Sequence, residues 1–338
     1  MSSIQLASDS ESPVLQAKNL KRVFKSPLGK QSLVRAVDGV SLELRKGETV
    51  GLLGETGCGK STLAELMAGL QDPSEGEVVF QGFPLNKKSS KSQWRELRQR
   101  VQIMFQNPFD SVDPRYRVMD ILTEPLEVNG VRAPERRDRA IAALETMKLT
   151  PPAEFIDRYP HEMSGGQLQR VCIARALMLN PSVLIADEPV SMLDISVRAG
   201  ILILLDELKN TRNMGILHIS HDISTLVAVS DRLLVMYLGK IVESGSTEVL
   251  VSSPAHPYLR VLLNSVPTVH DTLFTKGERE LTLKGDIPDP SNIPDGCSLW
   301  PRCPLAVEKC KIETPKLKPL DQMKTHRVAC HMAHTDDH

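Results

Sequence analysis

The sequence predicts an α/β protein built around a mainly parallel, doubly wound sheet. Short apolar runs alternate along the chain with segments of helical periodicity, which is the order that parallel sheets require. A glycine-rich turn joins one apolar run to the helix that follows it, an arrangement typical of phosphate-binding sites. The 338 residues allow one large α/β unit with an appendage, or about two domains.

The first elements are predicted from alternation and periodicity. Val14–Leu20 and Val34–Leu44 alternate apolar and polar residues as strands do, and ETVGLLG (residues 48–54) indicates a buried strand that ends in glycine. A helix follows, because four apolar residues recur at the i, i+3, i+4 and i+7 positions of one face. These residues are Leu63, Leu66, Met67 and Leu70.

The remaining elements continue this alternation. The charged segment Lys87–Arg100 leads to a strand in VQIMFQNPF, and Val112–Leu179 is mostly helical. Prolines break that helical stretch at Pro125, Pro151, Pro152 and Pro160. SVLIADEP and GILHISHD are two further apolar strands. The helix between them carries its apolar face on Ile201, Leu204, Leu205 and Leu208.

Composition excludes several classes of protein. Lys plus Arg total 41 against 42 for Asp plus Glu, so the net charge of −1 gives no overall attraction to nucleic acid. The longest aliphatic runs fall far short of the roughly 20 residues that a membrane-spanning helix needs. The N-terminal MSSIQLASDSES lacks the basic and apolar regions of a secretory signal, so we expect a cytosolic protein with reduced thiols.

The strongest motif is GETGCGKS, from Gly54 to Ser61, which satisfies G-x-x-x-x-G-K-[ST]. In such a loop the glycines let the backbone wrap around phosphate, Lys60 reaches the β and γ groups, and the Ser61 hydroxyl ligates Mg²⁺. The alternative is a glycine-rich turn that only caps a helix. Cys58, inside the loop, is interpreted as a small filler rather than as a reactive thiol.

Polar residues follow three of the predicted strands. Asp187 and Glu188 end SVLIADE, where one acid can hold the Mg²⁺ shell and the other can deprotonate a water. Gln106 could sense the γ-phosphate or its water, and His221 could donate a hydrogen bond to that phosphate. Taken alone, two acids form a solvated turn, a Gln is a surface residue and a His is structural, so these assignments depend on position. His218 is assigned to packing.

A second donor-rich turn, MSGGQ, lies 104 positions beyond Lys60. Exposed N–H groups at a helix start favour an anion, although the same turn could simply be the N-cap of a helix over Gln167–Leu179. If this turn is too distant from the chain's own phosphate loop to share one ligand, it must serve another molecule's nucleotide. That geometry implies a dimer with ATP held between two chains.

The order GETGCGKST, FQ, MSGGQLQR, VLIADEP, SMLD and SHD resembles the nucleotide-binding subunit of an ABC transporter, over about Val14 to Gly245. The resemblance implies a P-loop NTPase of RecA-like fold with a helical subdomain. It makes Gln106 the Q-loop residue, Asp187 the metal-side acid, Glu188 the catalytic base and His221 the switch histidine. Phe24 takes the place of the aromatic that stacks on adenine, and Met163 replaces the usual Leu. Further nucleotide-binding positions implied by it are Gly54, Glu55, Thr56, Gly57, Cys58, Gly59, Lys60, Ser61, Thr62, Ser164, Gly165, Gly166, Gln167 and Asp194.

Four cysteines in the tail have the spacing C-x5-C-x6-C-x19-C: Cys297, Cys303, Cys310 and Cys330. Spacing alone leaves zinc, an iron–sulfur cluster and unligated thiols equally open. HPYLRVLLNSVP and this Cys set are similar to the C-terminal extension of dipeptide and oligopeptide importer ATPases, in which four Cys hold a [4Fe-4S] cluster. MFQNPFDSVDPR resembles the second of the paired ATPases. We therefore expect a cluster at these cysteines.

The expected organisation is a flexible N-terminus (1–13), an ATP-binding domain (14–251) with a helical subdomain (about 107–179), and a Cys-rich extension (252–338). The resemblance implies an ATPase that powers peptide uptake at the cytoplasmic face of a bacterial inner membrane. Its partners would be a second ATPase chain, favoured as a heterodimer, two permease subunits and an extracytoplasmic binding protein.

Related cargoes and other functions fit some of the same motifs. The cargo could instead be nickel or glutathione. A DNA-repair ATPase would carry long heptad coils and a translation factor would carry two cassettes, whereas this sequence has no such coil and one cassette. A tail that senses redox state is compatible with transport.

Overall fold

The computed structural model describes residues 12–25, 33–86, 88–264, 281–323 and 325–334. Its main sheet has eight strands in the described part of the chain, in the order β11-β12-β10-β9-β3-β8-β7-β6. The strands β9, β3, β8, β7 and β6 are parallel, whereas β10, β12 and β11 are antiparallel to their neighbours. Their bounds are β3 Thr49–Leu53, β6 Val101–Met104, β7 Val183–Asp187, β8 Gly215–Ser220, β9 Arg232–Tyr237, β10 Lys240–Ser246, β11 Lys318–Pro319 and β12 Arg327–Val328. The mainly parallel α/β sheet is confirmed.

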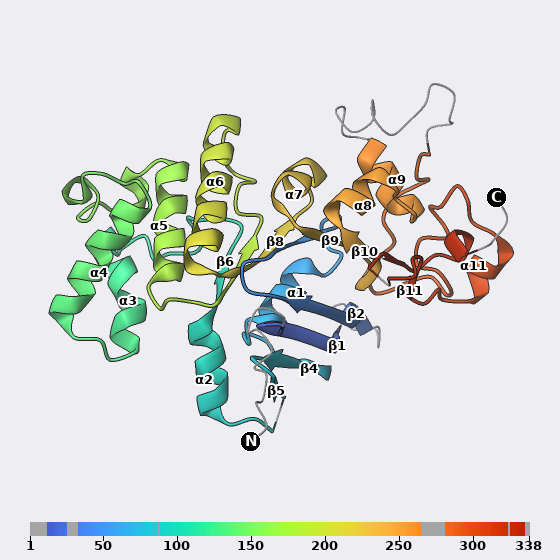
Figure 1. Cartoon of the computed structure of the whole chain (residues 1–338), viewed down its shortest axis with the longest axis horizontal. Helices are drawn as coiled ribbons and strands as arrows, with labels where there is room; N and C mark the ends of the chain where they lie inside the picture. Colours follow the sequence, from blue (N-terminus) through green and yellow to red (C-terminus); the bar gives the residue numbers. More distant parts are fainter. Residues whose placement is uncertain (1–11, 26–32, 87, 265–280, 324, 335–338) are drawn as a thin grey trace, which may run out of the picture.

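A second sheet of four antiparallel strands lies beside the main one, in the order β2-β1-β4-β5 (Figure 1). The predicted strands near residues 14–20 and 34–44 become β1 (Leu15–Lys25) and β2 (Leu33–Leu44). They pair along most of their length, and β4 (Glu75–Phe80) and β5 (Phe83–Leu85) complete the sheet. The antiparallel pairing follows from chain order, because β1 and β2 are consecutive strands.

Helices cover the main sheet and form a separate lobe (Figure 1). We call residues 107–179 the helical lobe; its helices α3, α4 and α5 lie at the opposite end of the molecule from α11. The helix bounds are α1 Lys60–Met67, α2 Lys91–Arg100, α3 Val118–Val128, α4 Ala133–Thr146, α5 Gly165–Leu177, α6 Ile195–Arg212, α7 Ile223–Val229, α8 Thr247–Ser252, α9 Pro257–Asn264 and α11 Glu308–Ile312.

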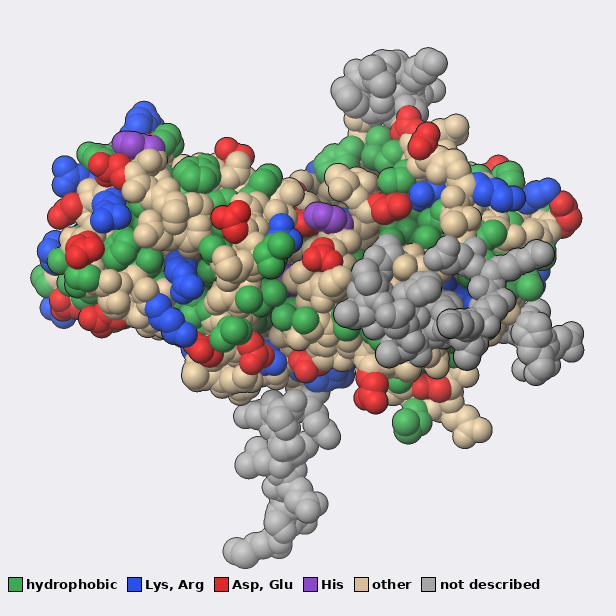
Figure 2. Space-filling model, turned by 90° about the horizontal axis from the view of Figure 1, so that it is seen from above, with side chains coloured by type: hydrophobic (Ala, Val, Ile, Leu, Met, Phe, Trp, Pro, Cys, Tyr) green, Lys and Arg blue, Asp and Glu red, His purple; other side chains and the backbone are tan. Residues whose placement is uncertain are grey.

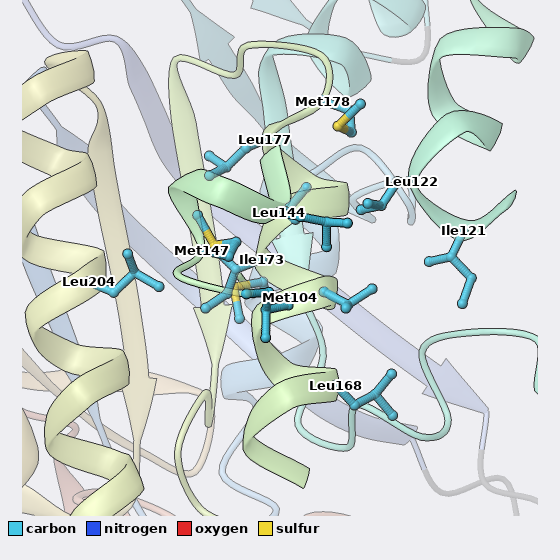
Figure 3. Packing of buried hydrophobic residues seen from close by; sticks show 14 of the residues in the cluster. Met104, Ile121, Leu122, Leu144, Met147, Leu168, Ile173, Leu177, Met178 and Leu204 are labelled. Carbon is cyan, nitrogen blue, oxygen red and sulfur yellow. The ribbon is translucent and has the colours of Figure 1, made fainter. Parts of the chain in front are cut away.

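The helical lobe has a hydrophobic core that continues into the sheet (Figure 3). Leu122, Leu144 and Ile173 come from α3, α4 and α5 and are fully buried. Met104 of β6 and Leu204 of α6 belong to the same cluster, so the lobe is packed onto the strand edge as well as onto itself. Burial of aliphatic side chains at this density stabilises the fold and fixes where the helix ends lie.

Two expectations about helices are wrong. Leu70 was placed on the buried face of the first helix, but α1 ends at Met67 and Leu70 is half exposed. Gly69 has φ +68°, a left-handed conformation that ends the helix before Leu70. Pro125 was expected to break a helix, yet it lies inside α3. The buried Leu122 and Leu126 on either side of it hold the helix together despite the missing N–H.

We call residues 281–334 the C-terminal segment. Its strand β12 pairs with β10, so this segment is joined to the main sheet through backbone hydrogen bonds. The fully buried Glu243 of β10 accepts hydrogen bonds from the N–H groups of Ala255 and His256, and it contacts His326 Nε2 at 2.8 Å. The Pro- and Cys-containing tail is therefore packed tightly onto the sheet.

Candidate nucleotide-binding site

The phosphate loop lies where the sequence places it, between the end of β3 and the start of α1. Gly59 is the N-cap of α1 with φ +106°, and a Cβ there would lie 1.9 Å from the Ala36 carbonyl oxygen. A Cβ on Gly54 would lie 2.5 Å from the Met236 carbonyl oxygen. Only glycine fits these two positions. The close packing of the rest of the fold around the loop therefore requires glycine here, which an ordinary surface turn would not.

Lys60 is the first residue of α1, and its side chain turns back over the loop. Its Nζ donates hydrogen bonds to the carbonyl oxygens of Gly54 at 2.8 Å and Glu55 at 3.1 Å. Lys60 is only 6% exposed. A buried ammonium held by carbonyl dipoles at the start of a helix favours an anion, and a triphosphate supplies the matching charge.

Asp187 ends β7 and lies next to the phosphate loop. Burial raises the pKa of Asp187, while a hydrogen bond with the Ser61 side chain and the charge of Lys60 lower it in part. The side chains of the two predicted Mg²⁺ ligands, Ser61 and Asp187, therefore lie close enough for Ser61 to affect the pKa of Asp187. Their hydroxyl and carboxylate oxygens are the donors that Mg²⁺ prefers.

Glu188, the predicted catalytic base, directly contacts His221, the predicted switch residue. Its Oε1 accepts a hydrogen bond from the His221 backbone N–H at 3.1 Å and lies 2.6 Å from His221 Nδ1. Glu188 is 8% exposed and has φ +52°, a left-handed conformation that is unfavourable for a residue with a Cβ. Its backbone N–H is fixed by the Ile219 carbonyl at 2.9 Å. The strands β7 and β8 thus hold an acid and an imidazole together at one sheet edge.

Gln106 is exposed in the loop that follows β6. Since β6 pairs with β7 in parallel, Gln106 follows the same edge of the sheet that carries Asp187. The edge therefore presents, strand by strand, the phosphate loop, His221, the two acids and Gln106.

The signature turn, Ser164 to Gln167, begins α5 in the helical lobe. Ser164 is the N-cap, and its Oγ accepts from Gln167 N at 3.3 Å while Ser164 N donates to Gln167 Oε1 at 3.0 Å. The capping interpretation is therefore correct for this turn, with Ser164 rather than a glycine as the cap. The helix α5 packs against α3, α4, α6 and β6, whereas α1 packs against β1, β2 and β7. The turn and the phosphate loop belong to different packing neighbourhoods of the chain.

Two other predicted residues lie at the surface. Asp194 is the exposed N-cap of α6, just beyond the strand that carries the acids. Phe24, the expected adenine-stacking residue, is half-buried in β1, and the Arg22 guanidinium lies 4.7 Å from its ring centroid. Thr56 lies in the phosphate loop, Thr62 lies in the first turn of α1, and Cys58 is buried.

The predicted [4Fe-4S] site is not supported. All four cysteines belong to the C-terminal segment, but the described residues contain no group of three or more His, Cys, Asp or Glu side chains that could hold a metal ion. Burial, and to a lesser extent the neighbouring thiols, raises the pKa of Cys297 to about 11, and burial also raises the pKa of Cys303 and Cys330.

Sequence reasoning missed two side chains that contact the phosphate loop. Arg302 of the C-terminal segment pairs with the Glu55 carboxylate at 3.0 Å, and the Tyr258 hydroxyl accepts from Glu55 N at 3.0 Å. Arg302 is separated from Glu55 by 247 positions, so no local pattern could have indicated the contact.

These features define a P-loop nucleoside triphosphatase: a glycine-rich phosphate loop, a buried Lys, and an acid–imidazole pair at the ends of adjacent strands. Comparison with known families narrows this class. Residues 37–191 match the family model described as ABC transporter, and residues 242–310 match the oligopeptide/dipeptide transporter C-terminal region. The chain belongs to the ABC transporter family, as an ATP-hydrolysing nucleotide-binding subunit whose C-terminal region is of the oligopeptide/dipeptide type.

Curated relatives span nearly the same length. The chain is 43% identical over 310 residues to the dipeptide transport ATP-binding protein DppF of Haemophilus influenzae, covering 90% of this chain and 93% of the relative. It is 42% identical over 324 residues to the oligopeptide transport ATP-binding protein AppF of Bacillus subtilis, covering 94% and 97%.

Solved structures show the same cassette. The dimeric post-hydrolysis ATP-binding cassette MJ0796, bound to ADP and Pi, superposes with a TM-score of 0.62 at 27% identity, covering 69% of this chain and 98% of that one. The structure of cbiO1 from Clostridium perfringens gives a TM-score of 0.63 at 26% identity, covering 78% and 99%. Among the described residues, no helix is both long and apolar enough to span a membrane.

Proposed function

We propose that this chain is the ATP-hydrolysing subunit of a peptide importer and that it works at the cytoplasmic face of the membrane as half of an ATPase dimer. The observation that carries this proposal is the contact between Glu188 and His221 beside the phosphate loop, in a chain of the oligopeptide/dipeptide type. The relatives named for dipeptide and oligopeptide transport support peptides as the cargo class.

Mg²⁺ fits the residues present. Ser61 lies close enough to Asp187 to lower its pKa in part, and Gln106 follows the neighbouring strand with an amide oxygen that could ligate the ion. When bound, Mg²⁺ neutralises charge on the phosphate oxygens. The charge of the cation opposes the effect of burial on the pKa of Asp187 and favours its carboxylate form. We therefore expect the metal and the nucleotide to bind together.

Catalysis is assigned to the acid–imidazole pair. Both hydrogen bonds from His221 go to Oε1 of Glu188, so we assign Oε2 to the proton of the attacking water. His221 holds the carboxylate in this orientation through its backbone N–H as well as its ring. Lys60 and the loop N–H groups bind the phosphates and stabilise the negative charge that develops on them.

The second ATPase chain supplies the signature turn. Ser164 to Gln167 cap an exposed helix start whose N–H groups and dipole favour an anion, and this turn lies in a different packing neighbourhood from the phosphate loop. Two chains arranged head to tail would complete each other's site. The MJ0796 cassette, whose solved structure is a dimer bound to ADP and Pi, supports a dimer.

A groove between the helical lobe and β6 is the proposed contact with the permease. Its cavity of about 340 Å³ is lined by Leu70, Phe105 and Val128, among others. These three side chains are 50%, 43% and 68% exposed, which is unusual for large apolar residues. An apolar groove beside the Gln106 loop fits one helix of a permease subunit, so docking there would reach the catalytic edge directly.

Co-purification from membranes tests the proposal. The tagged chain should bring down a second ATPase chain and two permease subunits, and the assembly should hydrolyse ATP faster when a peptide-loaded binding protein is added. Stimulation by nickel or glutathione instead of peptide would move the cargo to the alternative class. Recovery of a nucleic-acid repair complex would contradict transport.

No cluster-dependent step enters this proposal, because the cysteines as placed do not form a ligand set. Iron and sulfide analysis of anaerobically purified protein is the test. Substoichiometric iron is expected, whereas about four irons and four sulfides per chain would restore the [4Fe-4S] hypothesis. Zinc at one equivalent would favour the zinc alternative.

A further inference from the structure

Glu55, the second residue of the phosphate loop, is held by side chains from outside the nucleotide core. Arg302 donates to both carboxylate oxygens, from Nη1 to Oε2 at 3.0 Å and from Nη2 to Oε1 at 3.4 Å. The backbone N–H of Glu55 donates to the Tyr258 hydroxyl at 3.0 Å. Arg302 lies in the C-terminal segment and Tyr258 in α9, so both follow the last strand of the parallel sheet.

Neighbouring side chains bury the Arg302–Glu55 ion pair in part and hold the Arg302 guanidinium in one orientation. The side chain of Arg302 is 10% exposed and that of Glu55 is 26% exposed, so solvent screens the pair only in part. Arg302 also donates to the Tyr237 hydroxyl at 3.4 Å, and the Tyr237 and Tyr258 rings pack with centroids 5.0 Å apart. A two-pronged guanidinium–carboxylate contact, supported from behind by an aromatic pair, fixes both the position and the orientation of the carboxylate.

The position of Glu55 matters to the phosphate site because its carbonyl oxygen is part of that site. The oxygen accepts from Lys60 Nζ at 3.1 Å and from Cys58 N at 3.3 Å. Displacing the Glu55 side chain would therefore shift the Glu55 carbonyl, which accepts a hydrogen bond from Lys60. It would also shift the backbone N–H groups of the loop residues after Glu55.

We propose that Arg302 is a positioning residue for ATP binding: through Glu55, the C-terminal segment holds the phosphate loop in its nucleotide-binding conformation. Coupling of this kind is reciprocal. If docking of the C-terminal segment raises ATP affinity by a given factor, bound ATP raises the equilibrium constant for docking of that segment by the same factor. The inference rests on the ATPase class of the chain and is independent of its cargo.

A purely structural ion pair would hold the tail on the core without acting on the nucleotide. The two roles are separated by measuring trinitrophenyl-ATP affinity and thermal stability of the isolated full chain, for Arg302→Met, Glu55→Gln and the double variant. Arg327→Met is the matched control, because Arg327 is an exposed arginine of the same segment.

Arg302→Met and Glu55→Gln should each weaken nucleotide binding about tenfold, roughly what one charged hydrogen bond contributes. The double variant should be no weaker than either single one, Arg302→Lys should recover part of the affinity, and Arg327→Met should bind like the parent. Unchanged affinity in Arg302→Met, or additive losses in the double variant, would overturn the proposal.

Hydrogen exchange supplies a second measurement that does not depend on the arginine variant folding. In the parent chain, nucleotide should slow exchange at residues 297–303, and Glu55→Gln should remove most of that protection. Equal protection in both proteins would show that the tail does not respond to the loop. Since neither experiment uses peptide or permease, failure here leaves the importer proposal standing.

Discussion

The phosphate loop and the signature turn are both donor-rich turns at helix starts, but they are held in different ways. The loop is fixed by groups far away in the sequence, including Met236, Tyr258 and Arg302, and its lysine is buried. The signature turn is held by its own capping box, and its cap Ser164 is exposed while the next three residues are half-buried. One half-site is preorganised within the chain, while the other belongs to the helical lobe, which forms one end of the molecule (Figure 1). Figure 2 shows many Lys, Arg, Asp and Glu side chains on the surface at that end. The contrast is what a site completed by a second chain requires.

The largest effect should come from removing the base in the buried half-site. Glu188→Gln keeps the shape of the side chain but cannot accept the proton, so turnover should fall by about 10²- to 10⁴-fold while ATP binding is retained. Phosphate release in the assembled dimer measures turnover, and Glu248→Gln, an exposed acid of α8, is the control. Turnover at the parental rate would mean that Glu188 is not the base.

The exposed half-site should matter only when a partner is present. Ser164→Arg should lower turnover of the dimer by about 10²-fold, since it removes a donor to the partner's nucleotide. It should leave ATP binding to the isolated chain unchanged. Ser90→Arg is a closely matched control, because Ser90 caps α2 with the same Ser–Gln capping box. A monomer that hydrolyses ATP at full rate with Ser164 replaced would remove the shared site altogether.

A smaller effect is expected at the groove that joins the helical lobe to the sheet. Val128→Asp places a charge on an apolar surface and should reduce permease-stimulated ATPase activity about fivefold, while basal activity stays the same. Val307→Asp, at an exposed valine of the C-terminal segment, should do nothing. Equal losses from both substitutions would indicate a general effect on solubility instead of docking.

The last prediction concerns folding stability rather than activity, and how it changes with pH. Full burial lowers the pKa of His218 in β8 to about 4, below the 6.5 of an exposed histidine. Between these values the unfolded chain binds a proton that the folded chain does not, so stability falls as pH drops from about 6.5 to about 4. The loss is at most about 3 kcal/mol. Thermal unfolding of His218→Gln should show a shallower decline between pH 7 and pH 5, and exposed His161→Gln should match the parent.

Local patterns were sufficient for one part of the molecule. The strand, loop and helix from Thr49 to Met67 follow from hydrophobic runs and from glycine and lysine spacing, and the acids at the end of β7 follow from the same reasoning. These features are encoded within about ten residues, so a short stretch of sequence specifies them. The same reasoning placed Gln106 and His221 just after strands, and the structure has both at the edge that carries the acids, whereas their roles come from the family resemblance and stay predictions.

Long-range packing determines what local patterns did not predict. The helix continues through Pro125 because its buried neighbours outweigh one missing hydrogen bond, and Leu70 is excluded from the core by the conformation of Gly69. The pairing of β12 with β10, and the contact of Arg302 with Glu55, join segments far apart in the chain. The family resemblance implied a cluster at the four cysteines, but the described residues contain no group of three or more His, Cys, Asp or Glu side chains that could hold a metal ion.

The backbone at Glu188 has a consequence for protein engineering. Holding the Glu188 backbone at φ +52° costs about 1–3 kcal/mol of folding stability. Asn or Gly adopts this left-handed conformation more readily. Libraries selected for heat resistance alone would therefore accumulate Gly or Asn at position 188 and yield robust but inert proteins. Selection should retain a growth requirement that depends on the transporter.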